Sequence, residues 1–478
     1  MYRQYGLFID GAWRPAADGA TAPVFSPVSE KPLGEAPVAT LADTAEALES
    51  AARGLAAWRA KSAFERADAL HRIADEMLRR QDEAARMIST ETGKPLAQSG
   101  REWSLSVDQF RWFAEEARRI YGRIVESRVS GGRFEVLREP VGIAAAFTAW
   151  NFPAALVARK VAPALAAGCS IIVRPSSQTP GTAMVMVDCL AAGDLPPGTV
   201  NLVVGPTANT YTPLMAAPTV RKVSLTGSTR VGQQMLRDAA DTVKKVSMEL
   251  GGNAPLIVFD DADLDSALDV AVPTKFANAG QVCVTPDRFF VHERLHDDFV
   301  AGFVARANAL RLGDGLDPAV QMGPLINGRR LAEIEAIVAD AERAGAKIVA
   351  GGRRAAQFNA GHFYEPTVLT EVSDDMQVFA EENFGPIAAI TRFSSEDEVL
   401  ERANASAMGL SAYAFIRSPE RARRVVARLR SGMVGINSFA LAASEAPFGG
   451  TNHSGMGREG GIEGISDYLD TKLAQIVF

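Results

Sequence analysis

The chain has 478 residues, of which 47% are hydrophobic and 22% are charged, and its formal net charge is -7. These proportions are those of a soluble globular protein large enough for two or three domains, and they exclude the disordered and fibrous classes. The slight acidic excess provides no basic surface for nucleic acid or for an anionic membrane.

The chain also lacks the segments that direct a protein into or across a membrane. Its most apolar region, residues 141–173, is interrupted by Arg159 and Lys160, so no apolar run is long enough to span a bilayer. The N-terminal stretch reaches Asp10 and Gly11 before an apolar block forms, and we therefore expect no signal peptide. Three cysteines in the whole chain suit a reducing compartment, which predicts a cytoplasmic protein.

The first predicted elements are a pair of short strands around LFIDGAW, followed by helices. The pattern Asp43-x-x-Glu46 is typical of a capping box and predicts a helix from there to about residue 60. The pattern Ser62-x-x-Glu65 predicts a second helix, which continues to residue 89. A third helix is expected over residues 100–121.

Short apolar strands alternate with helices from residue 140 to residue 250. This spacing indicates right-handed crossovers in a parallel sheet, and fully apolar strands such as SIIV imply helices on both faces. Ligands bind beyond the carboxyl ends of such strands. The loops expected at that edge are TAWNFP (148–153), RPSSQTP (174–180), LTGSTRVG (225–232) and ELGGN (249–253).

A second α/β series runs from about residue 256 to MVGINS (433–438), which predicts another sheet and hence a second domain. The tail, YLDTKLAQIVF, alternates as a single strand with no obvious local partner. A terminal strand of this kind often pairs elsewhere, including on another subunit.

Cys283 lies in NAGQVCVTPDRFF, just past a Gly-Gln turn where a helix is expected to end. Most free cysteines are buried small hydrophobic residues, and that interpretation fits Cys169 and Cys189. A reactive cysteine instead needs access and a base. The position of Cys283 alone does not decide between the two.

Two polar residues at predicted strand ends are also open to two interpretations. Glu249 precedes Leu250 and a Gly-Gly pair, so it is either an ordinary strand-end carboxylate or a general base whose pKa is raised by burial. Asn151 is able to donate to a developing oxyanion, but a cap on the helix that begins near Pro153 is the favoured interpretation from local chemistry. The turn LTGSTRVG suits a phosphate but lacks the G-x-G-x-x-G spacing.

Seven segments in register resemble the aldehyde dehydrogenase superfamily over nearly the whole chain: WNFP, RPSSQTP, TGST-x-x-G, MELGGN, NAGQVC, EENFGP and PFGGTNHSGMGRE. WFAEEARRIYG, KFANAGQVC and EAPFGG are most similar to the succinate-semialdehyde and 2-oxoglutarate-semialdehyde dehydrogenase branch. The resemblance implies an α/β fold with a Rossmann-type cofactor domain, an α/β catalytic domain and a small β oligomerisation element.

In detail, the resemblance implies a cofactor-binding domain over 1–122 and 141–250 and a catalytic domain over 251–435. Residues 123–140 and 460–478 would form the oligomerisation element, which implies a homodimer or homotetramer. The implied partners are NAD or NADP and a small aldehyde, with no metal.

The resemblance also implies catalytic roles. Cys283 would attack the aldehyde carbon, because a planar aldehyde releases no hydride until attack makes that carbon tetrahedral. Asn151 and the backbone amide of Cys283 would hold the oxyanion of the thiohemiacetal. Hydride transfer to the nicotinamide would leave a thioester, and Glu249 would activate the water that hydrolyses it. Lys160 and Glu459 match residues of a proton relay.

Two further sets follow from the resemblance. The residues implied for the cofactor are Phe147, Thr148, Trp150, Arg174, Ser176, Ser177, Gly205, Thr226, Gly227, Ser228, Leu250, Glu382 and Phe384. The residues implied for the substrate are Arg118, Arg119, Trp112 and Phe439.

Two departures from the family pattern bear on specificity. Arg174 stands where the family usually has Lys, and Ser177 replaces a Glu that would repel a 2′-phosphate, so we expect NADP to be accepted, with NAD also possible. Semialdehyde enzymes of this branch usually carry Arg six residues before the nucleophile, but this chain has Ala277. Phe439 and Leu441 suggest an apolar wall.

The substrate is therefore expected to be an uncharged aliphatic or aromatic aldehyde, or a semialdehyde. A strict succinate-semialdehyde dehydrogenase is the alternative, with Arg118 or Arg119 binding the carboxylate. A CoA-acylating enzyme is disfavoured by the presence of Glu249, and a catalytically silent homologue by the presence of all three catalytic residues. Val284 beside the cysteine excludes a vicinal disulfide.

Overall fold

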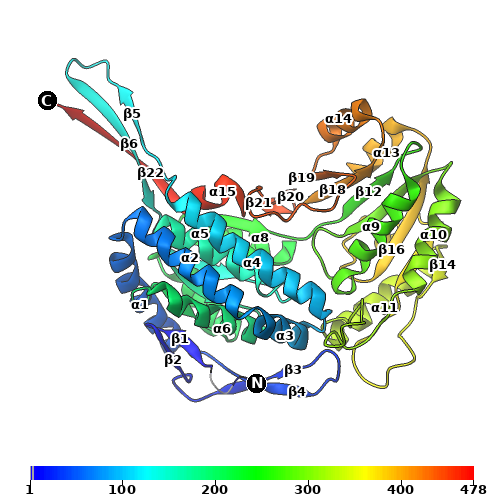
Figure 1. Ribbon diagram of the computed structural model, residues 1–478, viewed down its shortest axis with the longest axis horizontal. Helices are drawn as coiled ribbons and strands as arrows, with labels where there is room; N and C mark the ends of the chain where they lie inside the picture. Colours follow the sequence, from blue (N-terminus) through cyan, green and yellow to red (C-terminus); the bar gives the residue numbers. More distant parts are fainter. Residues whose placement is uncertain (1, 3–4) are drawn as a thin grey trace.

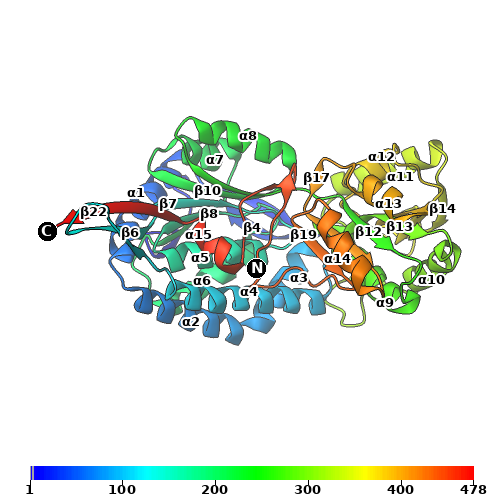
Figure 2. The ribbon, with the colours of Figure 1, turned by 90° about the horizontal axis from the view of Figure 1, so that it is seen from above.

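The computed structural model describes residue 2 and residues 5–478; residues 1, 3 and 4, which belong to the N-terminal stretch in which we expect no signal peptide, lie outside the described part. Two α/β bodies lie side by side, and a narrow β arm extends from the first body and carries the C-terminus at its tip (Figures 1 and 2). Within the described residues, no helix is long and apolar enough to cross a membrane.

The first body is built on a sheet with the strand order β2-β1-β9-β8-β7-β10-β11-β21. Its central strands from β9 to β11 pair in parallel, as the alternation of strands and helices predicts, and antiparallel strands close both edges. The strands are β1 (Leu7–Ile9), β2 (Ala12–Arg14), β7 (Ile143–Phe147), β8 (Ser170–Arg174), β9 (Val200–Leu202), β10 (Val220–Thr226), β11 (Lys245–Glu249) and β21 (Gly455–Met456).

Helices cover both faces of this sheet, because successive side chains of each strand point to opposite faces. Ala144 and Ala146 of β7 pack in the hydrophobic core formed by the helices α2 to α6, whereas Ala145 packs in the core formed by α1, α7 and α8. The helices are α1 (Leu41–Arg59), α2 (Ala63–Arg79), α3 (Gln81–Thr92), α4 (Leu96–Ala117), α5 (Ala155–Ala167), α6 (Pro180–Cys189), η1 (Leu190–Gly193), α7 (Thr207–Ala216) and α8 (Thr229–Ala240).

The N-terminal helices confirm one predicted start and correct two other predictions. The capping box at Ser62 and Glu65 is present as expected. The first capping box, however, is formed by Thr40 and Asp43, and Asp43 is therefore the N3 residue and not the cap. The helix predicted to run to residue 89 is divided at Arg80 into α2 and α3, because the backbone of Arg80 leaves the helical region.

The second body has a sheet of order β14-β15-β16-β13-β12-β18-β19, parallel except for the edge strand β14. Its strands are β12 (Ala254–Val258), β13 (Pro286–His292), β14 (Lys347–Ala350), β15 (Thr367–Thr370), β16 (Ile387–Phe393), β18 (Ser411–Phe415) and β19 (Met433–Ile436). Its helices are α9 (Leu264–Phe276), η2 (Ala277–Gly280), α10 (His296–Asn308), α11 (Gly328–Arg343), α12 (Gln377–Ala380), α13 (Glu396–Ala403) and α14 (Pro419–Arg428).

The C-terminal strand has no partner nearby in the sequence, as expected, and pairs with a distant segment of the same chain. β22 (Leu469–Val477) pairs along its whole length with β6 (Gly132–Pro140), which also pairs with β5 (Arg123–Glu126). The partner precedes β22 by more than 300 residues, so local sequence carried no sign of it. Smaller elements are β3 (Thr21–Phe25), β4 (Pro32–Pro37), β17 (Met408–Gly409), β20 (Thr451–Asn452) and α15 (Gly461–Ser466). The division into three domains remains a prediction.

Candidate active site

The loop between η2 and β13 holds Cys283 partly exposed. Asn278 and Ala279 in this loop have left-handed backbones, with φ of 48° and 54°. Gly280 at φ 72° lies against the carbonyl oxygen of Gly385, which an added Cβ would approach to 2.0 Å. Only glycine fits at position 280. The sequence NAGQVC therefore determines the backbone conformation that leads to Cys283.

Asn151 from the first body reaches this loop of the second. Its side-chain amide donates to the carbonyl of Gln281 at 3.1 Å, and Asn278 donates back to the carbonyl of Asn151 at 3.2 Å. Asn151 is buried, and its side-chain oxygen has no hydrogen-bond partner among the described residues. One amide hydrogen beyond the bond to Gln281 is available to a ligand.

Asn151 does not cap the helix that follows it, so the favoured local interpretation is wrong. The cap comes from Glu102 of α4, whose carboxylate accepts from the backbone amides of Ala154 and Ala155 at 2.8 and 3.2 Å. Its other oxygen accepts from Lys94 at 2.6 Å, and Lys94 also donates to the carbonyl of Asn151 at 2.7 Å. This buried pair, which the sequence analysis missed, fixes the backbone of Asn151.

Glu249 ends β11 and is buried, and neither carboxylate oxygen has a hydrogen-bond partner among the described residues. Burial raises the pKa of Glu249 well above its usual value, and the neighbouring charge of Glu459 raises it further. The following glycine, Gly252, packs so closely that an added Cβ would lie 2.3 Å from the carbonyl oxygen of Cys283. The strand end and the cysteine loop therefore meet.

The thiol of Cys283 is held in its protonated form. Burial raises its pKa to about 12, and the charges of Glu382 and Glu249 act in the same direction, whereas Arg159 opposes them. Since the thiolate is the nucleophile, Cys283 must lose its proton to a nearby base before it attacks.

Lys160 and Glu459, which were predicted as a pair, are in contact. The ammonium of the buried Lys160 donates to Glu459 at 2.5 Å and to the hydroxyl of Thr226 at 2.7 Å. The side chain of Thr226 is thus engaged by Lys160, although it was predicted to contact the cofactor.

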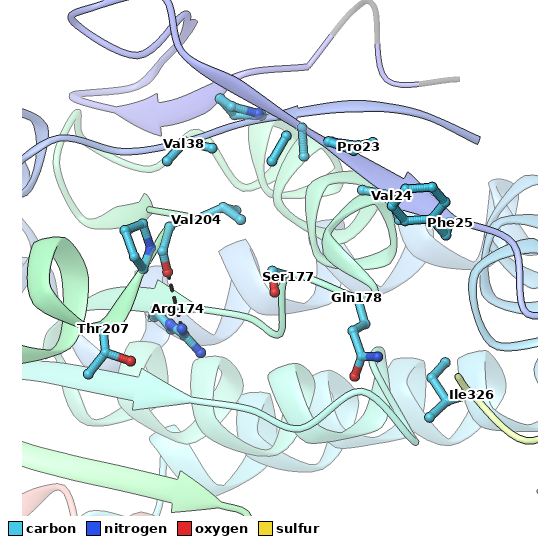
Figure 3. A pocket seen from close by; sticks show the side chains of 15 residues that line it. Pro23, Val24, Phe25, Val38, Arg174, Ser177, Gln178, Val204, Thr207 and Ile326 are labelled. Atoms are coloured by element: carbon cyan, nitrogen blue, oxygen red, sulfur yellow. Dashed lines mark hydrogen bonds between the residues drawn. The ribbon is translucent and has the colours of Figure 1, made fainter. Parts of the chain in front are cut away.

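The residues predicted to bind the cofactor ribose line a cavity of about 650 Å³ between the β3–β4 hairpin and the carboxyl ends of β8 and β9 (Figure 3). Arg174 donates to the carbonyl of Gly205 at 3.1 Å, and Ser177 lies across from it. Ser176 accepts from the amide of Gln178. The lining residues, all within the described part, include no carboxylate. With a guanidinium and no carboxylate, the cavity offers nothing that would repel a 2′-phosphate.

Three further predicted cofactor residues, Glu382, Trp150 and Phe384, form contacts between distant segments. Glu382 accepts from the amide of Gly252 at 2.9 Å, and burial raises its pKa to about 8. The rings of Trp150 and Phe384 meet edge to face with centroids 5.6 Å apart. Both pairs bring together segments that are more than 120 residues apart in the sequence.

The remaining predicted cofactor residues lie at or beside the carboxyl ends of β7, β10 and β11. Thr148 is buried, and its hydroxyl has no partner among the described residues, as expected of a group that bonds a ligand. Gly227 donates its amide to the carbonyl of Glu249, and Ser228 caps α8. Phe147 and Leu250 are buried in the core shared with α1, α7 and α8.

The structure does not bring Arg118 and Arg119 to the cysteine. Arg118 pairs with Asp68 at 2.8 Å and Arg119 with Glu116 at 2.7 Å, beyond the C-terminal end of α4. Gln98, near the other end of α4, accepts from the amide of Asn278. Twenty residues of helix separate Gln98 from Arg118, or about 30 Å.

The other two predicted substrate residues lie in different places. Trp112 donates to the carbonyl of Gly461 at 3.3 Å. The ring of Phe439 packs at a tilt against that of Tyr413, with centroids 4.4 Å apart, and Tyr413 donates to the carbonyl of Val284 beside the cysteine. Leu441 packs in the small cluster that contains Cys283, which supports an apolar wall there.

Arg159 is the residue that the sequence analysis overlooked. It is 7% exposed, lies 4.0 Å from the ring centroid of Phe448 and donates to the carbonyl of Ala442. No carboxylate of the described residues lies within ion-pair distance of its guanidinium, yet its charge is felt at Cys283. The charges of Glu459, Glu249 and Cys283 act on the guanidinium from beyond that distance, and a buried cation with no direct ion pair is suited to bind an anion. The sequence feature that could have identified Arg159 is the pair of adjacent basic residues in VARK.

Comparison with known proteins gives consistent matches over the full chain. The model of the Aldehyde dehydrogenase family matches residues 13–474. A 3-sulfolactaldehyde dehydrogenase of Pseudomonas putida is 46% identical, covering 97% of this chain and 95% of the relative. An NADP(+) succinate-semialdehyde dehydrogenase of Escherichia coli strain K12 is 43% identical, covering 99% and 97%. The crystal structure of a succinate-semialdehyde dehydrogenase from Burkholderia pseudomallei superimposes with a TM-score of 0.97 at 44% identity, covering 99% and 98%.

Proposed function

The chain belongs to the aldehyde dehydrogenase family and is an NAD(P)-dependent enzyme, and we propose that it oxidises a short aldehyde bearing an anionic group. One observation carries the chemistry: Cys283 and Asn151 come from loops of two different bodies, Glu249 comes from the end of β11, and the three meet at one place. Packing of the hydrophobic cores does not require that a thiol, an amide and a carboxylate lie together.

The proposed reaction begins at the cysteine. Glu249 removes the proton of the Cys283 thiol, whose raised pKa requires a base. The sulfur then bonds to the aldehyde carbon, and the electron pair of the carbonyl moves to oxygen. Asn151 and the backbone amide of Cys283 donate to that oxyanion, and losing one such donor typically costs about a hundredfold or more in rate.

NAD(P) supplies the hydride acceptor when bound. Arg174, Ser177, Glu382 and Phe384 are the residues proposed to hold it, and the absence of a carboxylate in the ribose cavity supports use of NADP. Glu249, freed of its first proton, then takes a proton from water as the water oxygen attacks the thioester carbon. The carbon–sulfur bond breaks, and the carboxylate product leaves.

Arg159 is proposed to recognise the distal end of the substrate. Its buried guanidinium has no carboxylate partner among the described residues and lies near the nucleophile. Two similar proteins are named for aldehydes with an acidic group, 3-sulfolactaldehyde and succinate semialdehyde. This favours an anionic substrate over the uncharged aldehydes expected from Ala277 and the apolar wall.

The test compares succinate semialdehyde, 3-sulfolactaldehyde and hexanal, each with NAD and NADP, in the wild type and in Arg159→Met. A charge-assisted hydrogen bond contributes about 1.5–3 kcal/mol, so we expect kcat/KM for the acidic aldehydes to fall roughly 10- to 150-fold. Hexanal should be affected little. Arg119→Met is the matched control and should behave as the wild type. If hexanal is preferred by the wild type, the anionic substrate is wrong.

We also propose a cytoplasmic homodimer or homotetramer. The three cysteines are unpaired, which fits a reducing compartment. The β5–β6–β22 sheet exposes apolar side chains that a second subunit would cover, including Ile124 at 71% and Leu473 at 64% exposure.

A further inference from the structure

Three neighbouring strands of the second sheet begin at the edge that meets the first body. β12, β13 and β16 lie side by side and run parallel. The segment leading into β12 follows Glu249, the segment leading into β13 contains Cys283, and the segment leading into β16 contains Glu382 and Phe384. The sheet thus brings the candidate base, the nucleophile and two residues proposed for the cofactor to one edge.

Residues 382–385, which we call the cofactor loop, pack backbone to backbone against the turn before Cys283. An added Cβ at Gly280 of this turn would approach the carbonyl oxygen of Gly385 to 2.0 Å. There is no room for a side chain between the two segments, so their relative position depends on the contacts that hold each of them in place.

A buried ion pair connects the cofactor loop with the cysteine loop, residues 281–285. Lys275 of α9 donates to Asp287 of β13 at 2.7 Å, and the two side chains are 0% and 3% exposed. The second carboxylate oxygen of Asp287 accepts from the backbone amide of Asn383 at 3.2 Å. Lys275 and Asp287 stand before and after the cysteine loop, and Asn383 stands between Glu382 and Phe384. The pair therefore closes the base of one loop and fixes the other to it.

The conformation of the cofactor loop is imposed by side chains from outside it. Phe384 has a left-handed backbone with φ of 47°, which is rare for a bulky residue and persists only when the surroundings hold it. Arg330 of α11 donates to the carbonyls of Asn383 and, at 3.3 Å, of Phe384. Asp287 holds the amide of Asn383 from the opposite partner, the strand next to the loop.

Stability alone does not account for this ion pair. Burying two charges costs about as much as their attraction returns, and apolar side chains of similar size often stabilise a protein equally well. A pair that only joined α9 to β13 would need one oxygen of Asp287. The bond from the second oxygen to the cofactor loop is the feature that apolar side chains would lack.

The two charges of the pair act in opposite directions on the cofactor loop. Burial raises the pKa of Glu382 to about 8; the charge of Asp287 acts in the same direction, whereas that of Lys275 opposes it. Removing both charges together should therefore change the position of the loop more than the ionisation of Glu382.

We propose that Lys275 and Asp287 position the cofactor for hydride transfer. Through the amide of Asn383 they hold Glu382 and Phe384 at the distance from Cys283 that the transfer requires. A misplacement of about 1 Å in such a site costs about a hundredfold in rate. In this role neither residue exchanges a proton or touches the aldehyde, so both are positioning residues. The role rests on the proposed function.

The experiment compares two double variants of the full chain. The Leu variant, Lys275→Met with Asp287→Leu, replaces the ion pair with apolar side chains of similar size and leaves the amide of Asn383 without this acceptor. The Asn variant, Lys275→Met with Asp287→Asn, also removes both charges but keeps a side-chain oxygen for that amide. The effect of the hydrogen bond is thereby separated from that of the charges.

Stopped flow follows reduced cofactor in a single turnover with NADP and whichever of succinate semialdehyde and hexanal the wild type oxidises faster. We expect the Leu variant to transfer hydride roughly 10- to 100-fold more slowly. Its isotope effect on kcat should rise when the aldehyde carbon carries deuterium, and its KM for the aldehyde should change little. The Asn variant should resemble the wild type.

A second assay depends on Cys283 but needs no hydride acceptor. p-Nitrophenyl acetate transfers its acetyl group to the sulfur and releases p-nitrophenolate, and water then hydrolyses the acetyl-enzyme. Both double variants should keep this activity, which Cys283→Ala should lose. The matched control is Asp269→Asn, which removes an exposed carboxylate of α9 that pairs with Arg306. It should behave as the wild type in both assays.

The positioning role is wrong if the Leu variant, shown to be folded by thermal unfolding, transfers hydride at the wild-type rate. It is also wrong if ester hydrolysis falls in parallel, because the pair would then support the cysteine loop as a whole. If the Leu variant does not fold, Lys275→Met with Asp287→Ala, which also lacks the acceptor, takes its place. A wild type that hydrolyses the ester at Cys283 but reduces no cofactor with any aldehyde would refute the proposed function itself.

Discussion

At the scale of single residues, the chemistry is determined by which groups the fold keeps neutral. Burial raises the pKa values of Cys283 and Glu382 to about 12 and about 8, and that of Glu249 well above its usual value. Burial therefore favours the neutral forms of these groups, and Cys283 reacts only when a base accepts its proton. The raised pKa values depend on how these residues pack in the fold. The sequence alone shows only that the residues match family motifs.

The raised pKa of Cys283 predicts how the free enzyme reacts with an alkylating agent. At pH values below the pKa of about 12, the thiolate fraction rises about tenfold for each pH unit, so iodoacetamide labelling should rise about a hundredfold between about pH 6 and pH 8. Above about pH 8, where Glu382 is ionised, replacing it with Gln removes a neighbouring negative charge and should increase labelling. Labelling is measured by peptide mass spectrometry, with Cys283→Ala as the control. A rate that does not change with pH would contradict this environment.

The role of a residue could be predicted from the sequence where a family motif contains that residue. It could not be predicted where the role depends on a contact between segments that are far apart in the chain. Cys283, Glu249 and Asn151 stand in motifs whose order is informative. Arg159 was considered only as an interruption of an apolar segment, since nothing local shows that it has no direct ion pair.

At the scale of secondary-structure elements, the N-terminus of α5 shows how one buried pair positions a functional side chain. Glu102 caps this helix and neutralises Lys94, and Lys94 in turn holds the carbonyl of Asn151. Lys94 and Glu102 are close in sequence, but both act on the segment 151–155, and no local pattern indicates this contact between distant segments.

Removing the charge of Glu102 should therefore affect both stability and activity. Breaking a buried ion pair costs about 3–5 kcal/mol, so Glu102→Gln should lower the free energy of unfolding by about that amount, as measured by denaturant titration. Turnover should also fall, because Asn151 loses its support. Asp340→Asn breaks an exposed pair with Arg343 and should cost less than about 1 kcal/mol. Equal losses in the two variants would show that Glu102 has no special role.

The helix boundaries illustrate the same limit. The Ser62 capping box was found because its residues are adjacent in the chain and bond to each other. The box at Thr40 was misplaced by three residues because Asp43 fits both the cap and the N3 position. The division at Arg80 carries neither Gly nor Pro, so the sequence offered no break signal.

At the scale of the whole molecule, the site depends on two bodies meeting. Asn151, Lys160 and Glu249 belong to the first sheet and its helices, and Cys283 belongs to the second. The alternation of strands and helices predicted both sheets, because each is formed from nearby crossovers. The pairing of β22 with β6 has no local signal, because the two strands are separated by most of the chain, and only the family resemblance grouped these segments.

The central claim is that Cys283 forms a thioester which Glu249 helps to hydrolyse. The most direct measurement is intact-protein and peptide mass spectrometry of Glu249→Gln after mixing with NADP and succinate semialdehyde. The account predicts about one equivalent of reduced cofactor and an acyl group on the peptide that contains Cys283. Continued turnover without an adduct, or an adduct on another residue, would contradict it.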